Sequence, residues 1–179
     1  MAKSQNGWLV LDNDTTGPPP RLRKWTVPTT NRHLLLRDGS AGFLLVHMAS
    51  WFDDAIEDLD REATWDDWGW ASRPIRGSSV VSNHASGTAM DLNATKHPLG
   101  VATRRTFSSA EMEKINDRLK FYNGCIRWGG NYMSRPDAMH FEINKGMAAV
   151  EQRARTLTAK PRGKSILEAN PGARAVIFA

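Results

Sequence analysis

The fold of this chain is decided by the stretch Ser82-Asn83-His84-Ala85-Ser86-Gly87-Thr88-Ala89-Met90-Asp91. Gly87 lets the chain turn from loop into strand, because glycine adopts backbone conformations that other residues avoid. The run from Thr88 to Leu92 then predicts a short strand. The stretch therefore places His84 in a loop and Asp91, seven residues later, in a strand, and both side chains are common metal ligands.

A second strand is predicted over Ala138 to Ile143, where apolar side chains alternate with His140 and Glu142. We expect a sheet with one buried apolar face and one working face, meaning the face that carries the polar side chains of the site. Neighbouring strands lie about 4.8 Å apart, so on adjacent strands Asp91 and His140 reach one ion. Two imidazoles and a carboxylate, with a fourth position for water, are the composition of a catalytic zinc site. Spacing alone favours the other interpretation, in which these are polar residues satisfied at the surface or in a turn.

The surrounding residues favour the metal site. Residues 82–91 match the pattern S-x-H-x-x-G-x-A-x-D, and residues 137–142 match D/E-x-x-H-x-E. Together these motifs resemble those of the M15 zinc peptidases, which include VanX and VanY dipeptidases and carboxypeptidases and phage L-alanyl-D-glutamate endolysins. The resemblance covers about Trp65 to Ile143, and it is most like the catalytic domains of actinobacterial-phage endolysins at residues 68–77, 93–100 and 127–132.

This resemblance implies an α+β fold, with a small antiparallel sheet packed against helices as in hedgehog and D-Ala-D-Ala peptidases. It implies a Zn²⁺ ion held by His84, Asp91 and His140. Asp137 matches the family's general base, which takes a proton from the attacking water and returns it to the leaving amine.

The resemblance also implies an arginine that stabilises the oxyanion, since a guanidinium stays charged and donates in a fixed fork. Arg73 matches the arginine of the family's Y-R-x motif, although Ser72 replaces the usual aromatic residue; Arg76 is the alternative. Ser82 matches a substrate-contacting serine, and a turn-forming serine is the other interpretation.

Glu142 is interpreted either as a hydrogen-bond partner of a ligand histidine or as a solvated strand carboxylate. The residues without motif context are expected to be structural: His33, His47, His97 and Cys125, the last as a buried thiol.

Three helices are predicted. Apolar residues at spacings of three and four predict a core helix from Leu44 to near Asp60. Ser108 and Glu111 form a capping box, and Asn123-Gly124 ends the helix that follows. A third helix follows Gly146, with inward positions at Met147, Val150, Ala154 and Leu157.

At 179 residues the chain suits one domain. We expect a zinc peptidase domain over 1–159, in which 1–31 is an irregular lead-in, because Gly17-Pro18-Pro19-Pro20 breaks regular structure. Residues 160–179 contain two prolines and several basic residues, and predict a loosely packed C-terminal extension or a linker.

The formal charge of +5 suits a solvated surface or an acidic partner, either nucleic acid or an anionic cell wall. Nucleic acid is not expected, because no zinc-finger spacing or basic-region heptad is present. Neither a secretory signal nor a run of roughly 18–20 apolar residues is found. We therefore expect no stable membrane association and a protein held in the cytoplasm until lysis. We also expect a monomer.

The function expected from these observations is hydrolysis of an amide bond in the peptide stem of bacterial peptidoglycan by a phage-type endolysin. One alternative keeps the site and changes the bond, giving a bacterial D,D-carboxypeptidase or dipeptidase. A different class is a zinc-bound but non-catalytic binding domain. The presence of Asp137 beside the three predicted ligands favours an enzyme.

Overall fold

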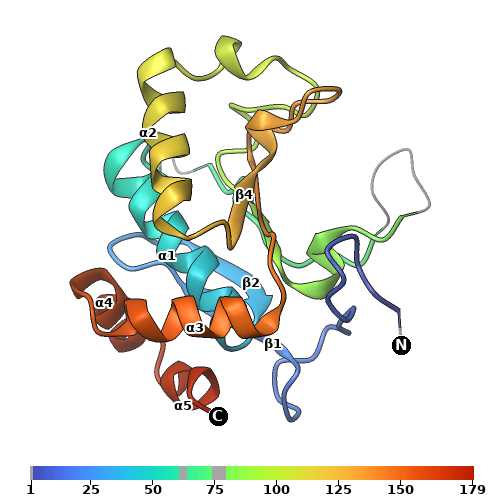
Figure 1. Cartoon of the computed structure of the whole chain (residues 1–179), viewed down its shortest axis with the longest axis vertical. Coiled ribbons are helices and arrows are strands. Elements are labelled where there is room, and N and C mark those ends of the chain that lie inside the picture. Colours follow the sequence, from blue (N-terminus) through green and yellow to red (C-terminus); the bar gives the residue numbers. More distant parts are fainter. Residues whose placement is uncertain (1, 61–63, 74–79) are drawn as a thin grey trace.

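The computed structural model describes residues 2–60, 64–73 and 80–179 and shows an α+β fold with two small antiparallel sheets (Figure 1). One sheet pairs β1 (Leu22–Thr26) with β2 (His33–Arg37). The other has the order β3–β5–β4, from Ala89–Asp91, His140–Ile143 and Ile126–Trp128. The predicted fold class is confirmed.

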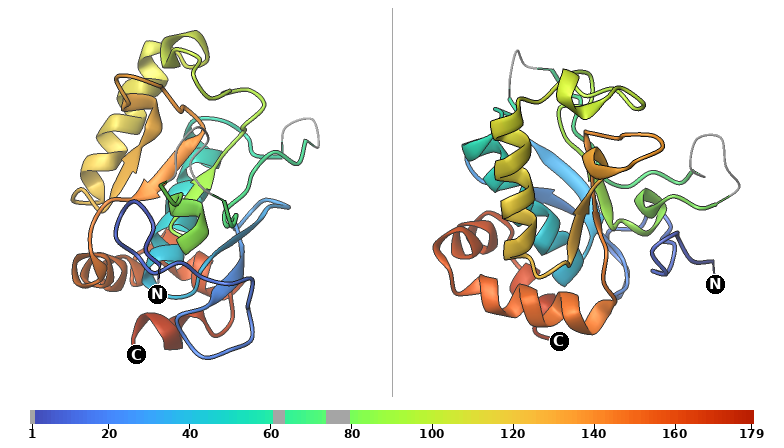
Figure 2. Two further views of the ribbon diagram at one scale, coloured as in Figure 1. Left: turned by 90° about the vertical axis from the view of Figure 1, so that its right-hand side faces the viewer. Right: turned by 45° about the horizontal axis from the view of Figure 1, so that its top comes forward.

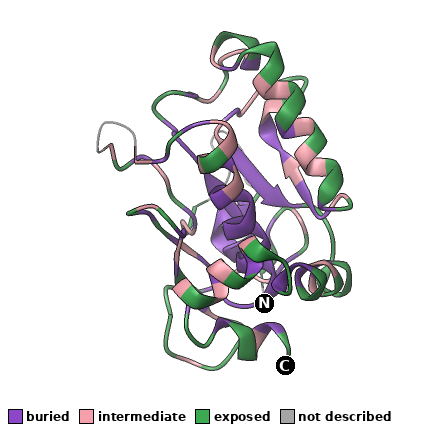
Figure 3. Ribbon diagram, turned by 90° about the vertical axis from the view of Figure 1, so that its left-hand side faces the viewer, coloured by how far each residue is buried: buried purple, intermediate pink, exposed green. Residues whose placement is uncertain are grey.

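Helix α1 (Ser40–Ala55) lies at the centre of the molecule, packed against the first sheet, β5 and the C-terminal helices. Its nearly continuous burial is visible in Figure 3, and Phe43, Leu44 and Phe52 are fully buried. The helix ends at Ala55, before the predicted end near Asp60. The N–H groups of Leu59 and Asp60 bond to the carboxylates of Asp53 and Asp58 instead, so side chains replace the helical acceptors.

Helix α2 (Ser109–Phe121) begins as predicted, with both hydrogen bonds of the Ser108–Glu111 capping box present. It ends where Asn123 and Gly124 adopt positive φ angles of 52° and 73°. Helix α3 (Met147–Thr158) confirms the third predicted helix. Three of its four predicted inward residues are buried, but Met147 is 55% exposed because it lies in the first turn, beyond the edge of the core.

The two ends of the chain are more regular than expected. Strand β1 lies inside the predicted irregular lead-in, where Leu22 and Trp25 are fully buried. The tail is not loosely packed: α4 (Pro161–Ala169) and α5 (Ala173–Ile177) contact α1 or α3, and Ile166 is fully buried. Figure 2 shows these helices lying against the rest of the fold.

Two 3-10 helices adjoin the second sheet, η2 (Asn83–Ser86) before β3 and η4 (Gly129–Asn131) after β4; a third, η3 (Thr103–Arg105), precedes α2. The predicted adjacency of the two motif strands is confirmed, since β3 and β5 pair antiparallel with Asp91 opposite His140. Within the described part of the chain, no helix has the length and apolar character needed to cross a membrane.

Candidate metal centre

The centre is built from η2, β3 and β5. Ser82 caps η2 by accepting a hydrogen bond from the His84 N–H, and Gly87 ends it in the left-handed conformation at φ 67°. A Cβ atom at Gly87 would also lie 2.6 Å from the backbone nitrogen of Arg37. Both the positive φ angle and this close backbone contact therefore require glycine at this position. This turn brings His84 beside Asp91 of β3.

Three donor atoms converge on one point. His84 Nε2 lies 3.2 Å from Asp91 Oδ1 and 3.1 Å from His140 Nδ1, and His140 Nδ1 lies 2.9 Å from the same oxygen. All three residues are at most 8% exposed. Ligands at about 2.0–2.1 Å in a tetrahedral zinc site are separated by about 3.3–3.4 Å, so small adjustments suffice. Among the described residues, these three form the group of side chains suited to a metal ion.

The outer nitrogens of both histidines face acceptors. His84 Nδ1 lies 2.5 Å from the Gly69 carbonyl oxygen, and His140 Nε2 lies 3.1 Å from Glu142 Oε2. In the neutral rings these contacts hold the protons on the outer nitrogens, so two lone pairs and a carboxylate oxygen face one another. Such an arrangement needs a positive charge among the three atoms, and a zinc ion supplies one with the ligand types that this site offers.

The pKa shifts agree with this need for positive charge. Burial alone disfavours the charged forms, but His84 and His140 outweigh it and lower the pKa of Asp91. Burial likewise disfavours the imidazolium of His140, while hydrogen bonds to Asp91 and Glu142 raise its pKa to about 10. Either a proton on His140 or a metal ion satisfies the buried carboxylates.

Glu142 lies at the centre of a buried hydrogen-bond network and is 1% exposed. Its Oε1 accepts from Arg127 and from the Tyr132 hydroxyl, the latter at 2.5 Å, and its Oε2 accepts from Asn83 and His140. Burial raises the pKa of Glu142, but these donors outweigh it and lower the pKa to about 2. The predicted working face of β5 is thus buried, and Glu142 is not a solvated strand carboxylate.

Asp137 lies in the turn that enters β5, where its carbonyl oxygen accepts the N–H of His140 at 3.1 Å. Its Oδ1 is buried and has no hydrogen-bond partner among the described residues. Burial raises the pKa of its carboxyl group, against the opposing effect of His140. The turn packs tightly on η4, because a side chain at Gly129 would lie 2.5 Å from the Asp137 carbonyl oxygen. An unpartnered carboxylate oxygen beside the centre suits proton transfer.

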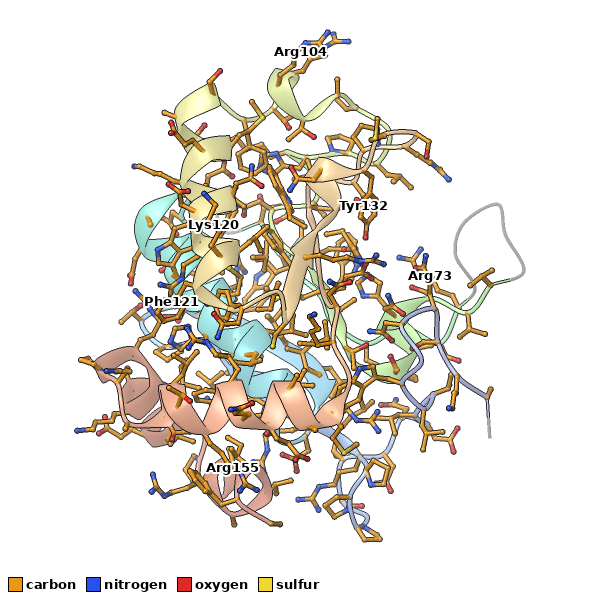
Figure 4. All side chains as sticks on the ribbon, in the orientation of Figure 1. Arg73, Arg104, Lys120, Phe121, Tyr132 and Arg155 are labelled. Atoms are coloured by element: carbon orange, nitrogen blue, oxygen red, sulfur yellow. The ribbon has the colours of Figure 1, made fainter. Side chains whose placement is uncertain are left out.

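A cleft of about 580 Å³ opens over the centre. Ser82, Arg73, Tyr132 and Asp137 line it together with the three converging residues. Arg73 and Tyr132 approach it from different segments (Figure 4). Arg73 has its charge exposed at the cleft wall, while Arg76, the alternative arginine, lies outside the described residues.

The remaining histidines lie elsewhere. His33 is on the exposed side of β2 near Thr26, and buried His47 contacts the hydroxyl of Tyr122. His97 is fully buried and lies 2.9 Å from Glu57, with its ring stacked on Phe107. The thiol of Cys125 is buried, as expected.

Sequence reasoning missed three members of the network around Glu142, namely Asn83, Arg127 and Tyr132. Asn83 lies inside the first motif, and the other two lie in a segment that resembles the family, so the sequence could have marked all three as residues near the site. The sequence does not show that they share Glu142 as a partner, because a pairing across 59 residues, as between Asn83 and Glu142, leaves no local pattern.

Comparison with known proteins supports the same centre. Residues 76–143 match a family model described as D-alanyl-D-alanine carboxypeptidase, and this segment contains all three converging residues and Asp137. No curated protein and no solved structure shows significant similarity to the chain.

Proposed function

Because residues 76–143 carry the signature of the M15 peptidases, we propose that the chain is a zinc-dependent peptidase that hydrolyses an amide bond in the peptide stem of bacterial peptidoglycan. The observation that carries the proposal is the convergence of His84, Asp91 and His140 in a cleft that is also lined by Asp137, whose buried Oδ1 has no hydrogen-bond partner among the described residues.

In this proposal His84, Asp91 and His140 hold the ion. Zinc in such a set supplies a Lewis acid for the substrate carbonyl and lowers the pKa of water. Glu142 holds the His140 ring with Nδ1 turned towards Asp91, so that this nitrogen would be available to the ion.

Asp137 accepts the proton of the attacking water and later delivers it to the leaving amine. Its raised pKa, caused by burial, fits a group that must hold a proton between these two steps. Arg73 at the cleft wall stabilises the negative charge that develops on the carbonyl oxygen. Ser82 lines the same cleft, and its hydroxyl accepts the His84 N–H as the cap of η2. Its main role is therefore to hold η2, and a contact with substrate comes second.

Two scissile bonds are compatible with this site. The resemblance of residues 68–77, 93–100 and 127–132 to phage endolysins favours an internal bond such as L-Ala-D-Glu. The description of the matching family model favours a terminal D-Ala instead. We propose the endolysin role first, with the chain acting on the wall after lysis begins.

The experiment is digestion of purified peptidoglycan by the zinc-loaded chain, followed by mass spectrometry of the released termini. New amino termini on D-Glu support the endolysin, and loss of terminal D-Ala alone supports the carboxypeptidase. If the zinc-loaded chain releases no new termini from walls of several chemotypes, the enzyme proposal is wrong and a binding domain is favoured.

A further inference from the structure

A second cavity, of about 370 Å³, lies between the N-terminal segment and the start of α3. Trp8, Arg37, Lys3, Gly146 and Met147 are among the residues that line it. The two walls are joined by a hydrogen bond from the Trp8 indole to the Lys145 carbonyl oxygen at 3.1 Å. None of these residues belongs to the metal centre.

Arg37 brings a buried positive charge to this cavity. The residue is 4% exposed, and no carboxylate among the described residues pairs with it. Its Nη1 donates to the carbonyl oxygens of Leu9 and Ser86 at 3.1 and 3.0 Å, while Nε and Nη2 have no acceptor among the described residues. The Trp8 ring lies 5.1 Å from the guanidinium carbon. A buried guanidinium without a counter-ion is costly, so an anion at its free donors is stabilising.

The start of α3, at Gly146 and Met147, lines the same cavity. Its N-cap is Gly146, which has no side chain to cap the helix, and no acidic residue lies in the first turn. The N–H groups of Met147, Ala148 and Ala149 have no acceptor among the described residues. The amino end of a helix of this length carries partial positive charge and free donors, and both attract anions.

We propose that this cavity binds a phosphate group carried on a small organic molecule. Arg37 and the first turn of α3 donate to the phosphate oxygens, and Lys3 adds a second positive charge at the rim. A phosphate suits three such groups better than a carboxylate because it offers more acceptor oxygens and up to two negative charges. Trp8 and Met147 provide the apolar surface against which the organic part packs.

The test is a titration of the full chain, freed of metal with a chelator, with inorganic phosphate and, at matched ionic strength, with acetate. Removal of metal and an Arg73→Ala background exclude phosphate bound in the catalytic cleft. The readout is the amide NMR signals of residues 147–149, the first turn of α3, none of which lines the catalytic cleft. We expect saturable shifts with phosphate and at least about tenfold weaker binding of acetate.

Gly146→Asp places a carboxylate at the N-cap, where a Cβ has no atom within 4 Å, so the variant is expected to fold. It should abolish the phosphate response, and Lys3→Ala should weaken it. Gly146→Ala, the matched neutral control, should keep it. If residues 147–149 do not respond to phosphate, or respond equally in Gly146→Asp, the site does not exist. An equal response to acetate contradicts the choice of phosphate.

Discussion

The Nε2 atom of His140 lies 3.1 Å from Oε2 of Glu142, on the side of the ring opposite Asp91. This contact joins the centre to Asn83, Arg127 and Tyr132, which all donate to the same carboxylate. Since Glu142 accepts four hydrogen bonds while buried, it holds the orientation of the His140 ring more firmly than a solvated group.

Glu142→Gln should lower zinc affinity about 10–100-fold, because the amide lacks the negative charge that fixes His140 and cannot accept at all four positions. Competition with a chelator of known zinc affinity measures this change. The matched control is Glu113→Gln, an exposed carboxylate on α2, which should leave zinc affinity unchanged. Equal affinities for the parent and Glu142→Gln would show that the network does not act on the metal.

Asp137→Asn should keep zinc and lose about 10²–10⁴-fold in the rate of wall hydrolysis, because an amide cannot accept the water proton. Asp117→Asn, an exposed substitution on α2, serves as control. Release of wall peptides is measured in parallel with zinc content. Parental activity in Asp137→Asn would refute the base assignment, and loss of zinc would reassign Asp137 to the ligand set.

Gly129→Ala should destabilise the chain by about 1–3 kcal/mol and reduce activity, since the added methyl group meets the Asp137 carbonyl oxygen at 2.5 Å and displaces the turn that enters β5. Urea denaturation and wall hydrolysis measure the two effects. Gly146→Ala, whose Cβ meets nothing within 4 Å, is the matched control. Unchanged activity in Gly129→Ala would show that the position of this turn does not matter.

The free energy of unfolding should depend on pH in the acid range because of the ionised carboxylate of Glu57. Burial raises its pKa, but hydrogen bonds from His97, Lys96 and Asn93 outweigh this and lower it from the usual 4.5 to about 2. A lowered native pKa means that the contribution is complete above pH 4.5 and is lost as pH falls towards 2.

In metal-free protein, Glu57→Gln should therefore be less stable than the parent by about 1–3 kcal/mol at neutral pH, and the difference should shrink as pH falls from 4.5 to about 2. Urea denaturation of both proteins at a series of pH values measures it. A difference that is constant over this interval would mean that the Glu57 charge makes no contribution.

Local patterns predicted the parts of the fold that depend on local chemistry. The capping box at Ser108, the glycine turn at Gly87 and the alternation around His140 each carry their own signal, and each element is present. The motifs also grouped His84, Asp91 and His140, which the structure brings together.

The prolines of the tail do not interrupt regular structure, contrary to the prediction from the sequence. Pro161 instead occupies the first turn of α4. Backbone N–H groups in a first turn make no hydrogen bond within the helix, so a proline there costs none. Helix α1 ends before the predicted position because Asp53 and Asp58 compete for backbone donors, and the spacing of apolar residues carries no signal of that competition. Which donors meet at Glu142 depends on segments far apart in the sequence.

The most direct test of the account is the zinc content of the purified chain, measured by inductively coupled plasma mass spectrometry in the parent and in His84→Ala. The account predicts about one zinc ion per parent chain and a large loss in His84→Ala, since removal of one of three ligands opens the site. Full zinc occupancy in His84→Ala, or none in the zinc-supplied parent, would contradict it.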